Sequence, residues 1–331
     1  MPRTNKKEAK EFLKNINSND KVAIIHDNDE DGFMSAILLY NLCKRKSTIA
    51  KTFAFIRGKS SLEKYKLKRF NKILIADLAP NLINKELTKI KNKKIWYTDH
   101  HKKDVRIPKN ILEYRTKSEI SSAKAIFELT RGTPLQEAIA NSVDMGIKQK
   151  NNKKIILKYL KKIKYSPQKW NKNILYPIAR TIIYFEKNPR RAFNKLRRIN
   201  TIKDIKILRK YDKKVGNEIK RQIKKYNNYH EKINKINLFH FNPKYPIKSA
   251  IVNEISTKKP KQTFIFITPK SKNTYSISAR NQTGKVDMIK LLKKATKNLK
   301  DTTAGGHVPA AGGIIQKKDL QKFKDNLKRI S

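Results

Sequence analysis

The first 150 residues alternate short apolar runs with segments whose apolar side chains recur at helical spacing. A short run rich in β-branched and aromatic residues predicts a strand, whereas apolar residues three and four positions apart predict a helix. This alternation favours an α/β fold with a parallel sheet and right-handed crossovers. The expected strands are 21–25, 49–56, 73–76 and 95–97, and the expected helices are 5–17, 34–42, 120–129 and 134–143.

Residues 151–235 form a second region, in which apolar side chains between Ile202 and Tyr226 again keep helical spacing. Such periodicity is not typical of a disordered segment. The region carries 27 Lys+Arg against 5 Asp+Glu, so we expect a basic helical connector. Its aromatic side chains either pack the helices together or stack on nucleic-acid bases; they are Tyr159, Tyr165, Trp170, Tyr184 and Phe185.

The last region, 236–331, returns to alternating strands and helices. Its pattern predicts a smaller mixed α/β domain. The sequence thus predicts three parts, 1–150, 151–235 and 236–331. In the third part, the expected strands are 263–267 and 275–280, after a first apolar run near 238–241, and the expected helices are 286–298 and 318–329.

The formal net charge is +52, from 79 Lys+Arg against 27 Asp+Glu. A lysine- and isoleucine-rich translation of an A/T-rich genome, or adaptation to heat, explains part of this excess. A surface this positive should attract a polyanion, and nucleic acid is the partner we expect. An anionic membrane surface is the weaker alternative, because no amphipathic apolar face accompanies the charge.

The composition also indicates where the protein works. Cys43 is the only cysteine, so an intrachain disulfide is excluded and a reducing cytoplasm is expected. No apolar stretch approaches the length needed to cross a bilayer, and residues 1–7 lack the apolar segment of a signal peptide. We therefore expect a cytoplasmic protein without a membrane partner.

Acidic and histidine residues follow the predicted strands. Asp29 and Asp31 come after the first strand, Asp77 directly follows 73–76, and Asp99-His100-His101 follow 95–97. The carboxyl ends of parallel strands share one edge, where open α/β folds bind ligands. Of the 27 acidic residues, 17 lie in the first 150 positions, so this edge is acidic within a very basic chain. Carboxylates gathered there would repel each other unless divalent cations neutralised them, and oxygen with imidazole ligands favours Mn²⁺ or Mg²⁺ over Zn²⁺.

These stretches, together with Asp144 and the segment from Gly305 to Gly312, resemble the DHH phosphoesterase superfamily, in particular its RecJ-like nuclease and nanoRNase branch, in an archaeal-type form. The resemblance covers nearly the whole chain. The C-terminal pattern Gly-Gly-His-x-x-Ala-Ala-Gly distinguishes this branch from family II inorganic pyrophosphatases, which share only the N-terminal motifs.

The resemblance implies a catalytic DHH domain over 1–150 and a substrate-binding domain over 236–331, with the active site in the cleft between them. It also implies two divalent ions, Mn²⁺ first and Mg²⁺ as the alternative, with Asp77 bridging them. Two ions would activate a water molecule for in-line attack on phosphorus. His26 is a sixth candidate ligand beside five core ligands, but it stands at a different offset from the other branches; the five are Asp29, Asp31, Asp77, His100 and Asp144.

The remaining candidates are expected to act beside the metals. Asp99 is expected to orient a neighbouring group, as metal sites commonly require, and His101 to contact the scissile phosphate. By resemblance, Arg280 binds a phosphate as a bidentate fork. Gly305 and Gly306 are expected to offer an N–H nest for an anion, with His307 as a further donor.

The resemblance therefore implies a single-strand-specific exonuclease that acts on DNA or RNA, with roles in DNA repair and replication. One alternative is a nanoRNase, or a phosphodiesterase for small nucleotides such as pAp or cyclic dinucleotides. The long basic surface argues against this alternative. A second alternative is a non-catalytic replisome scaffold that binds components such as GINS. Loss of metal ligands would mark such a scaffold, whereas all five core ligands are present here.

Overall fold

The computed structural model describes residues 6–90, 93–101, 105–144, 146 and 149–330. The chain divides into two compact units, Met1–Asp212 and Lys213–Ser331, and the boundary falls inside helix α10 (Arg209–Tyr229). Most of the predicted connector therefore packs with the first unit.

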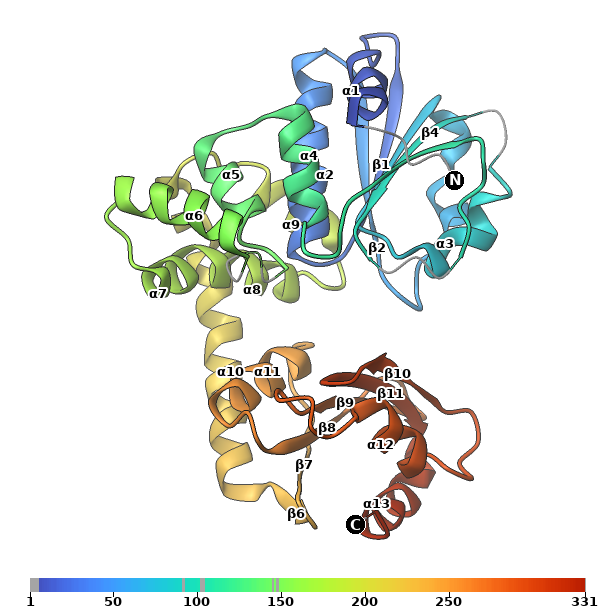
Figure 1. The fold of residues 1–331 in the computed structure, drawn as a ribbon, viewed down its shortest axis with the longest axis vertical. Helices are drawn as coiled ribbons and strands as arrows, with labels where there is room; N and C mark the ends of the chain where they lie inside the picture. Colours follow the sequence, from blue (N-terminus) through green and yellow to red (C-terminus); the bar gives the residue numbers. More distant parts are fainter. Residues whose placement is uncertain (1–5, 91–92, 102–104, 145, 147–148, 331) are drawn as a thin grey trace. The chain divides into compact units, whose positions relative to one another are not determined.

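The first unit contains a five-stranded sheet in the order β2-β1-β3-β4-β5, and every pair is parallel (Figure 1). The predicted parallel α/β fold is therefore confirmed. Strand β5 was not expected, because its sequence Ile-Leu-Glu-Tyr-Arg has neither an apolar run nor a clean alternation. The strands are β1 (Lys21–Asp27), β2 (Ile49–Phe55), β3 (Lys72–Ala76), β4 (Lys94–Asp99) and β5 (Ile111–Arg115).

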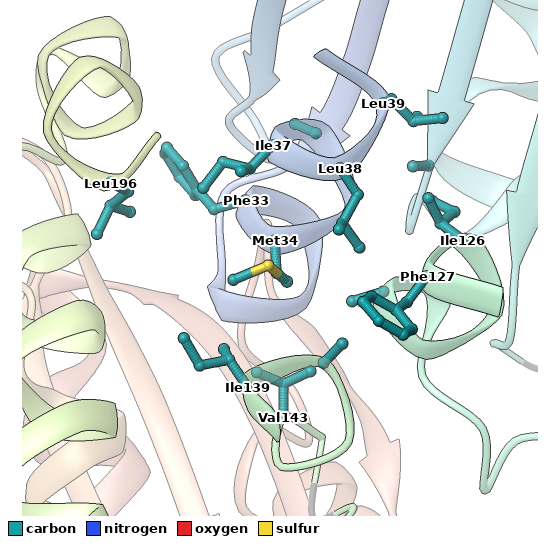
Figure 2. Packing of buried hydrophobic residues seen from close by; sticks show 14 of the residues in the cluster. Phe33, Met34, Ile37, Leu38, Leu39, Ile126, Phe127, Ile139, Val143 and Leu196 are labelled. Atoms are coloured by element: carbon teal, nitrogen blue, oxygen red, sulfur yellow. The ribbon is translucent and has the colours of Figure 1, made fainter. Parts of the chain in front are cut away.

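Both faces of this sheet are covered, which explains why its central strands are apolar throughout. Val22 and Ile24 point to one face and pack with α2, whereas Ala23 and Ile25 point to the other and pack near α3. Helix α2 is the centre of the larger core: Phe33 and Leu38 reach Leu196 and Phe127 on its two sides (Figure 2). The helices are α1 (Lys6–Lys14), α2 (Glu30–Arg45), α3 (Pro80–Leu87), α4 (Ser122–Thr130) and α5 (Pro134–Ala140), with short 3₁₀ turns at Leu62–Tyr65 and Leu67–Arg69.

The predicted connector, 151–235, is mainly helical as far as Tyr229, but Glu231–Ile233 form a strand that was not expected. Aromatic side chains of this region pack its helices together. Trp170 is fully buried, and its indole Nε1 donates to Ser142 Oγ at 3.0 Å. Tyr159 meets Trp170 edge-on, with ring centroids 5.8 Å apart, and Phe185 packs on Tyr211. The packing interpretation therefore holds for these rings. The elements are α6 (Lys150–Lys162), α7 (Pro167–Trp170), a π-helical turn (Asn171–Leu175), α8 (Tyr176–Tyr184), α9 (Pro189–Leu196), a 3₁₀ helix (Ile202–Leu208) and α10.

The second unit is built on a six-stranded sheet in the order β10-β11-β9-β8-β7-β6. Only β7 and β8 pair in parallel, so the sheet is mixed. Helices α12 and α13 cover the face that carries Ile265, Ile277 and Ile315. The elements are β6 (Glu231–Ile233), β7 (Ile236–His240), α11 (Lys248–Lys258), β8 (Thr263–Pro269), β9 (Thr274–Arg280), α12 (Met288–Ala295), β10 (Thr303–His307), β11 (Ala310–Gln316) and α13 (Leu320–Lys328).

None of the helices in the described part of the chain is both long and apolar enough to span a membrane.

Candidate metal centre

The candidate site lies at the carboxyl edge of the first sheet. Helix α2 connects β1 to β2 on one face, whereas α3 connects β3 to β4 on the other. The chain therefore leaves β1 and β3 in opposite directions, and the crevice between such strands is the usual ligand site of open α/β folds. Asp31 follows β1, Asp77 follows β3 and His100 follows β4.

Four predicted ligands meet at this edge, and we call them the metal centre: Asp31, Asp77, His100 and Asp144. One ligand atom from each lies within 4.8 Å of the others. His100 Nε2 lies 2.9 Å from an Asp144 oxygen, 3.4 Å from Asp77 and 3.7 Å from Asp31. Three are buried, and the Asp144 side chain is 39% exposed, so the group is open to solvent on one side.

The backbone holds these side chains in fixed directions. The two oxygens of Asp31 accept from the N–H groups of Ser122 and Ala123, at 2.8 and 2.7 Å, at the start of α4. A helix N-terminus favours a negative charge, so α4 stabilises the ionised carboxylate. The Ser122 hydroxyl also donates to Asp77 at 3.2 Å. Ser122 therefore positions two ligands at once.

Two of the ligands stand on strained backbone. Asp77 and Asp144 have φ values of 62° and 48°, in the left-handed region that few residues other than glycine adopt. Such conformations gather at functional sites, where the surrounding structure maintains them. Gly32 allows the tight turn after β1, because a Cβ there would come within 2.3 Å of the Asp27 carbonyl oxygen.

Like charges crowd this site. Burial, followed by the charges of Asp144 and Asp29, raises the pKa of Asp31 to about 7. Burial and the neighbouring carboxylates raise the pKa of Asp77 well above its usual range. Burial alone would lower the pKa of His100, but Asp144 and Asp31 outweigh it and raise that pKa to about 9. Each of these shifts is in the direction expected where carboxylates lie close together in a buried site.

Two buried atoms at the centre lack a suitable partner. Asp77 Oδ2 has no hydrogen bond, and His100 Nε2 has none of good direction even though Asp144 is 2.9 Å away. His100 Nδ1 lies 3.1 Å from the Ser118 carbonyl oxygen, so Nδ1 would keep its proton when a metal replaces the proton on Nε2. These donors fit a hard divalent cation such as Mn²⁺ or Mg²⁺.

His101 is held differently. Its Nδ1 lies 2.7 Å from Asp99 Oδ1, and Arg115 contacts the other Asp99 oxygen through two nitrogens at 3.0 and 3.1 Å. Burial would raise the pKa of Asp99, but His101 and Arg115 lower it, so its carboxylate stays charged. The arrangement turns His101 Nε2 away from Asp99, and the ring is one-third exposed. The partly exposed ring also lies 4.0 Å from Asp77, at the edge of the metal centre.

Asp29 lies at the margin of the metal centre. Its carboxylate caps α2 by accepting the Gly32 N–H at 3.0 Å. Burial and then the charge of Asp27 raise its pKa to about 6, and Asp144 adds to this effect. Asp29 is not one of the four residues whose ligand atoms gather at the metal centre, so its role as a metal ligand stays a prediction.

His26 does not join the group. It is buried against Phe33, with ring centroids 4.8 Å apart, and its Nδ1 lies 2.8 Å from the Asp27 carbonyl oxygen. Burial lowers its pKa to about 4, so the ring is neutral. His26 lies within β1, and side chains alternate along a strand, so it shares the face of Val22 and Ile24 that packs with α2. As placed here, it acts as a packing residue.

Three residues near the site were not predicted. Ser122 holds two of the ligands, and Arg115 holds Asp99. Arg57, just after β2, pairs with Asp27 while about half of its side chain remains exposed. Only Ser122 had a sequence signal, since it stands at a helix start; the strand register that pairs Asp99 with Arg115 is invisible in the sequence.

The predicted substrate residues lie in the second unit. Opposite residues of antiparallel strands share one face, so the pairs Arg280–Ala310 and Ala310–His307 place Arg280 and His307 on the same face. They are two strands apart, about 10 Å. Ala310 lies between them, and its small side chain leaves space above this part of the sheet.

The two adjacent glycines lie in strand β10 and not in a turn, so they do not form the predicted N–H nest. Gly305 lies on the Arg280 face, opposite Gly312. A Cβ at Gly305 would meet nothing within 4 Å, so packing does not require a glycine there. Gly306 has a φ of 138°, and its Cβ would come within 2.5 Å of the Ala310 carbonyl oxygen, so the hairpin requires it.

Two family models match the chain. Residues 21–160 match the DHH family, N-terminal domain, and residues 234–330 match the DHHA1 domain. Together they account for more than two thirds of the chain. No curated protein matches it by sequence.

Solved structures share the fold. RecJ from Thermus thermophilus in complex with Mn²⁺ matches with a TM-score of 0.72 and 15% identity, over 100% of this chain and 55% of that one. An exonuclease RecJ bound to manganese has a TM-score of 0.72 and 14% identity, over 100% and 95% of the two chains. CDC45 from Entamoeba histolytica has a TM-score of 0.56 and 11% identity, over 97% and 98%. The present chain thus spans about half the length of the Thermus RecJ.

Proposed function

Because the chain belongs to the DHH phosphoesterase superfamily and has a RecJ-like fold, we propose that it is a metal-dependent exonuclease acting on single-stranded DNA or RNA. One observation carries this proposal: Asp31, Asp77, His100 and Asp144 converge at the carboxyl edge of the sheet, where Asp77 Oδ2 and His100 Nε2 are buried without a hydrogen-bond partner. A buried group of carboxylates with raised pKa values is best explained by cations that neutralise it.

The metal centre would hold two divalent ions, with Mn²⁺ ahead of Mg²⁺, and Asp29 would complete the ligand set. Such ions neutralise phosphate charge and lower the pKa of a water molecule. The chain's own groups would do the rest. His101, whose Nδ1–H donates to Asp99, would donate from Nε2 to a phosphate oxygen as an imidazolium, and Arg115 would keep Asp99 charged.

The second unit supplies the groups that would bind the strand. Arg280 offers a guanidinium whose acceptors within the described chain are both neutral, the Asn253 side chain and the Ala279 carbonyl. His307 stands on the same face. Ala310, Gly312 and Gly305 have small or no side chains, so they leave room on this face for a sugar-phosphate backbone. The net charge of +52 would draw a polyanion to the protein.

A second function of another class has one observation in its favour, the fold similarity to CDC45. A replisome scaffold that binds partners such as GINS would need no metal. The four ligands that gather at the sheet edge, with two unpartnered buried atoms among them, favour an enzyme instead.

The proposal is tested with end-labelled single strands of DNA and RNA, from dinucleotides to long oligomers, in Mn²⁺ and in EDTA. We expect stepwise shortening of long strands in Mn²⁺ and none in EDTA. Cleavage confined to the shortest oligomers would indicate the nanoRNase alternative. The absence of any cleavage of any strand by the Mn²⁺-loaded protein would overturn the enzymatic proposal.

A further inference from the structure

Lys248 is a cation that no predicted site includes, and it reaches the face that carries Arg280. It begins helix α11, and its Nζ donates to Ser276 Oγ at 2.6 Å. Side chains alternate along a strand, so Ser276, Ser278 and Arg280 of β9 share one face. Lys248 and Arg280 therefore approach the same face from a helix and a strand.

This face lacks negative charge. Among the described residues, neither Lys248 nor Arg280 forms an ion pair with a carboxylate; their hydrogen-bond acceptors are Ser276, Asn253 and the Ala279 carbonyl. The one carboxylate near the middle of α11, Glu254, pairs with Lys258 at 3.0 Å. Two half-buried cations without a counterion are costly to the fold unless a ligand supplies the negative charge.

Neighbouring charges change the proton affinity of Lys248. Burial, followed by the charges of Arg280 at the end of β9 and of Lys270 beyond β8, lowers the pKa of Lys248 to about 7. These two cations are the charged groups that act on Lys248 from the strands against which α11 packs. An anion bound among them would reverse the effect, because it favours the charged ammonium.

We propose that Lys248 binds phosphate together with Arg280, and that the pair holds an internal phosphodiester of a nucleic-acid strand on this face of the second unit. The inference rests on the proposed function and deepens it by adding a second cation to the strand-binding surface. The Lys248–Ser276 hydrogen bond places the amine on the face that also carries Ser278 and Arg280, and Gly312, opposite Ser278, has no side chain to fill the neighbouring position.

Binding at this site has a consequence that catalysis does not require. Lys248 is partly neutral near pH 7 in the free protein and becomes fully protonated when the phosphodiester binds. Strand binding therefore takes up a proton, and affinity falls as the pH rises above 7. A phosphodiester does not titrate in this range, so a strand with hydroxyl ends isolates the contribution of the protein.

The experiment is isothermal titration calorimetry of the full chain in EDTA with a single-stranded oligonucleotide carrying hydroxyl ends. Titrations in buffers of different ionisation enthalpy count the protons taken up at pH 7 and pH 8.5. The variants are Lys248→Met, Lys248→Arg and, as a control of equal charge change on the same helix, Lys258→Met.

We expect the wild type to take up a fraction of a proton at pH 7 and to bind about tenfold more weakly at pH 8.5. Lys248→Arg should bind well at both pH values without that proton, because arginine stays charged. Lys248→Met should bind about tenfold more weakly at pH 7, whereas Lys258→Met should bind like the wild type. Circular dichroism of each variant verifies folding.

Equal affinity of wild type and Lys248→Met, or proton uptake that persists in Lys248→Arg, would overturn the inference and leave the exonuclease proposal intact. Failure of the wild type to bind any oligonucleotide would overturn both. A protein that binds strands with Lys248-dependent proton uptake but cleaves none of them would overturn only the exonuclease proposal.

Discussion

In the first unit, Asp31, Asp77 and Asp144 surround His100, whereas in the second unit Lys248 and Arg280 share a face without a carboxylate partner. Both sites gather like charges, and in both burial, together with these charges, shifts pKa values toward the neutral forms, upward for the Asp31 and Asp77 carboxyls and downward for the Lys248 amine. Each arrangement stores an electrostatic cost that a ligand of opposite charge removes.

The two sites differ in how firmly they are built. The carboxylates of the metal centre are held by backbone N–H groups and by the hydroxyl of Ser122, on backbone that is strained at Asp77 and Asp144. Lys248 and Arg280 of the second unit are held, among the residues that the structure describes, by two neutral side chains and one carbonyl. A rigid site suits ions that need defined geometry, whereas a looser one suits a flexible strand.

The largest expected effect comes from Asp77→Ala. Asp77 is fully buried and touches the other ligands, so its loss should reduce hydrolysis in Mn²⁺ below detection. The folded state should survive, because the substitution removes a carboxyl whose pKa is strongly raised. Rate assays with Mn²⁺ titrations measure this effect. Hydrolysis at the wild-type rate by this variant would mean that the metal centre is not required for catalysis.

A smaller loss is expected for Asp99→Asn, which neutralises the partner of His101 and Arg115. Groups that orient others at metal sites typically contribute about 10- to 100-fold to activity. We expect a loss in that range with Mn²⁺ affinity nearly unchanged, because Asp99 itself lies outside the four-ligand group. A matching loss of Mn²⁺ binding would mean that Asp99 is a ligand.

The role of the second unit in binding the strand is tested by Arg280→Gln. Loss of charge-assisted hydrogen bonds to a phosphate should weaken kcat/KM by about 10- to 100-fold. The number of bound Mn²⁺ ions should stay the same, since Arg280 belongs to the second unit. His307→Ala should behave similarly but with a smaller loss. A drop in Mn²⁺ stoichiometry in either variant would contradict the division of roles between the two sites.

The smallest effect concerns the stability of the metal-free protein. The pKa of Asp31 is about 7 in the folded state against an ordinary value of 3.8. Between these values the folded state holds the extra proton, so the free energy of unfolding falls as the pH rises, by at most about 1.4 kcal/mol per pH unit for one group. Thermal melts from pH 5 to pH 7 should show a steeper fall for the wild type than for Asp31→Asn. An equal dependence of stability on pH in the two proteins would mean that folding does not raise the pKa of Asp31.

Much of the first unit could be predicted, since apolar runs that end on Asp77 and on Asp99-His100 mark strands and their carboxyl edge directly. Strand β5 and the contact of Arg115 with Asp99 were not predicted, because the mixed side chains of this edge strand show no clear hydrophobic period. His26 was offered as a ligand from its position in the motif, but whether a strand-end side chain faces the edge or the core depends on the turn that follows.

The second unit was harder to predict. Gly305 and Gly306 suggested a turn, but they pair with β11 in a strand. Lys248 is one of 79 basic residues and carries no motif. Its role depends on the register that brings Ser276 to α11, which is a property of tertiary packing alone.

The central claim is that divalent ions bind at the carboxyl edge of the first sheet. Crystals soaked in Mn²⁺ and measured at the manganese absorption edge test it most directly. We predict anomalous peaks among Asp31, Asp77, His100 and Asp144, with Asp29 drawn into contact and His26 left in the core. No peak at this edge, or a peak held by other residues, would contradict the account.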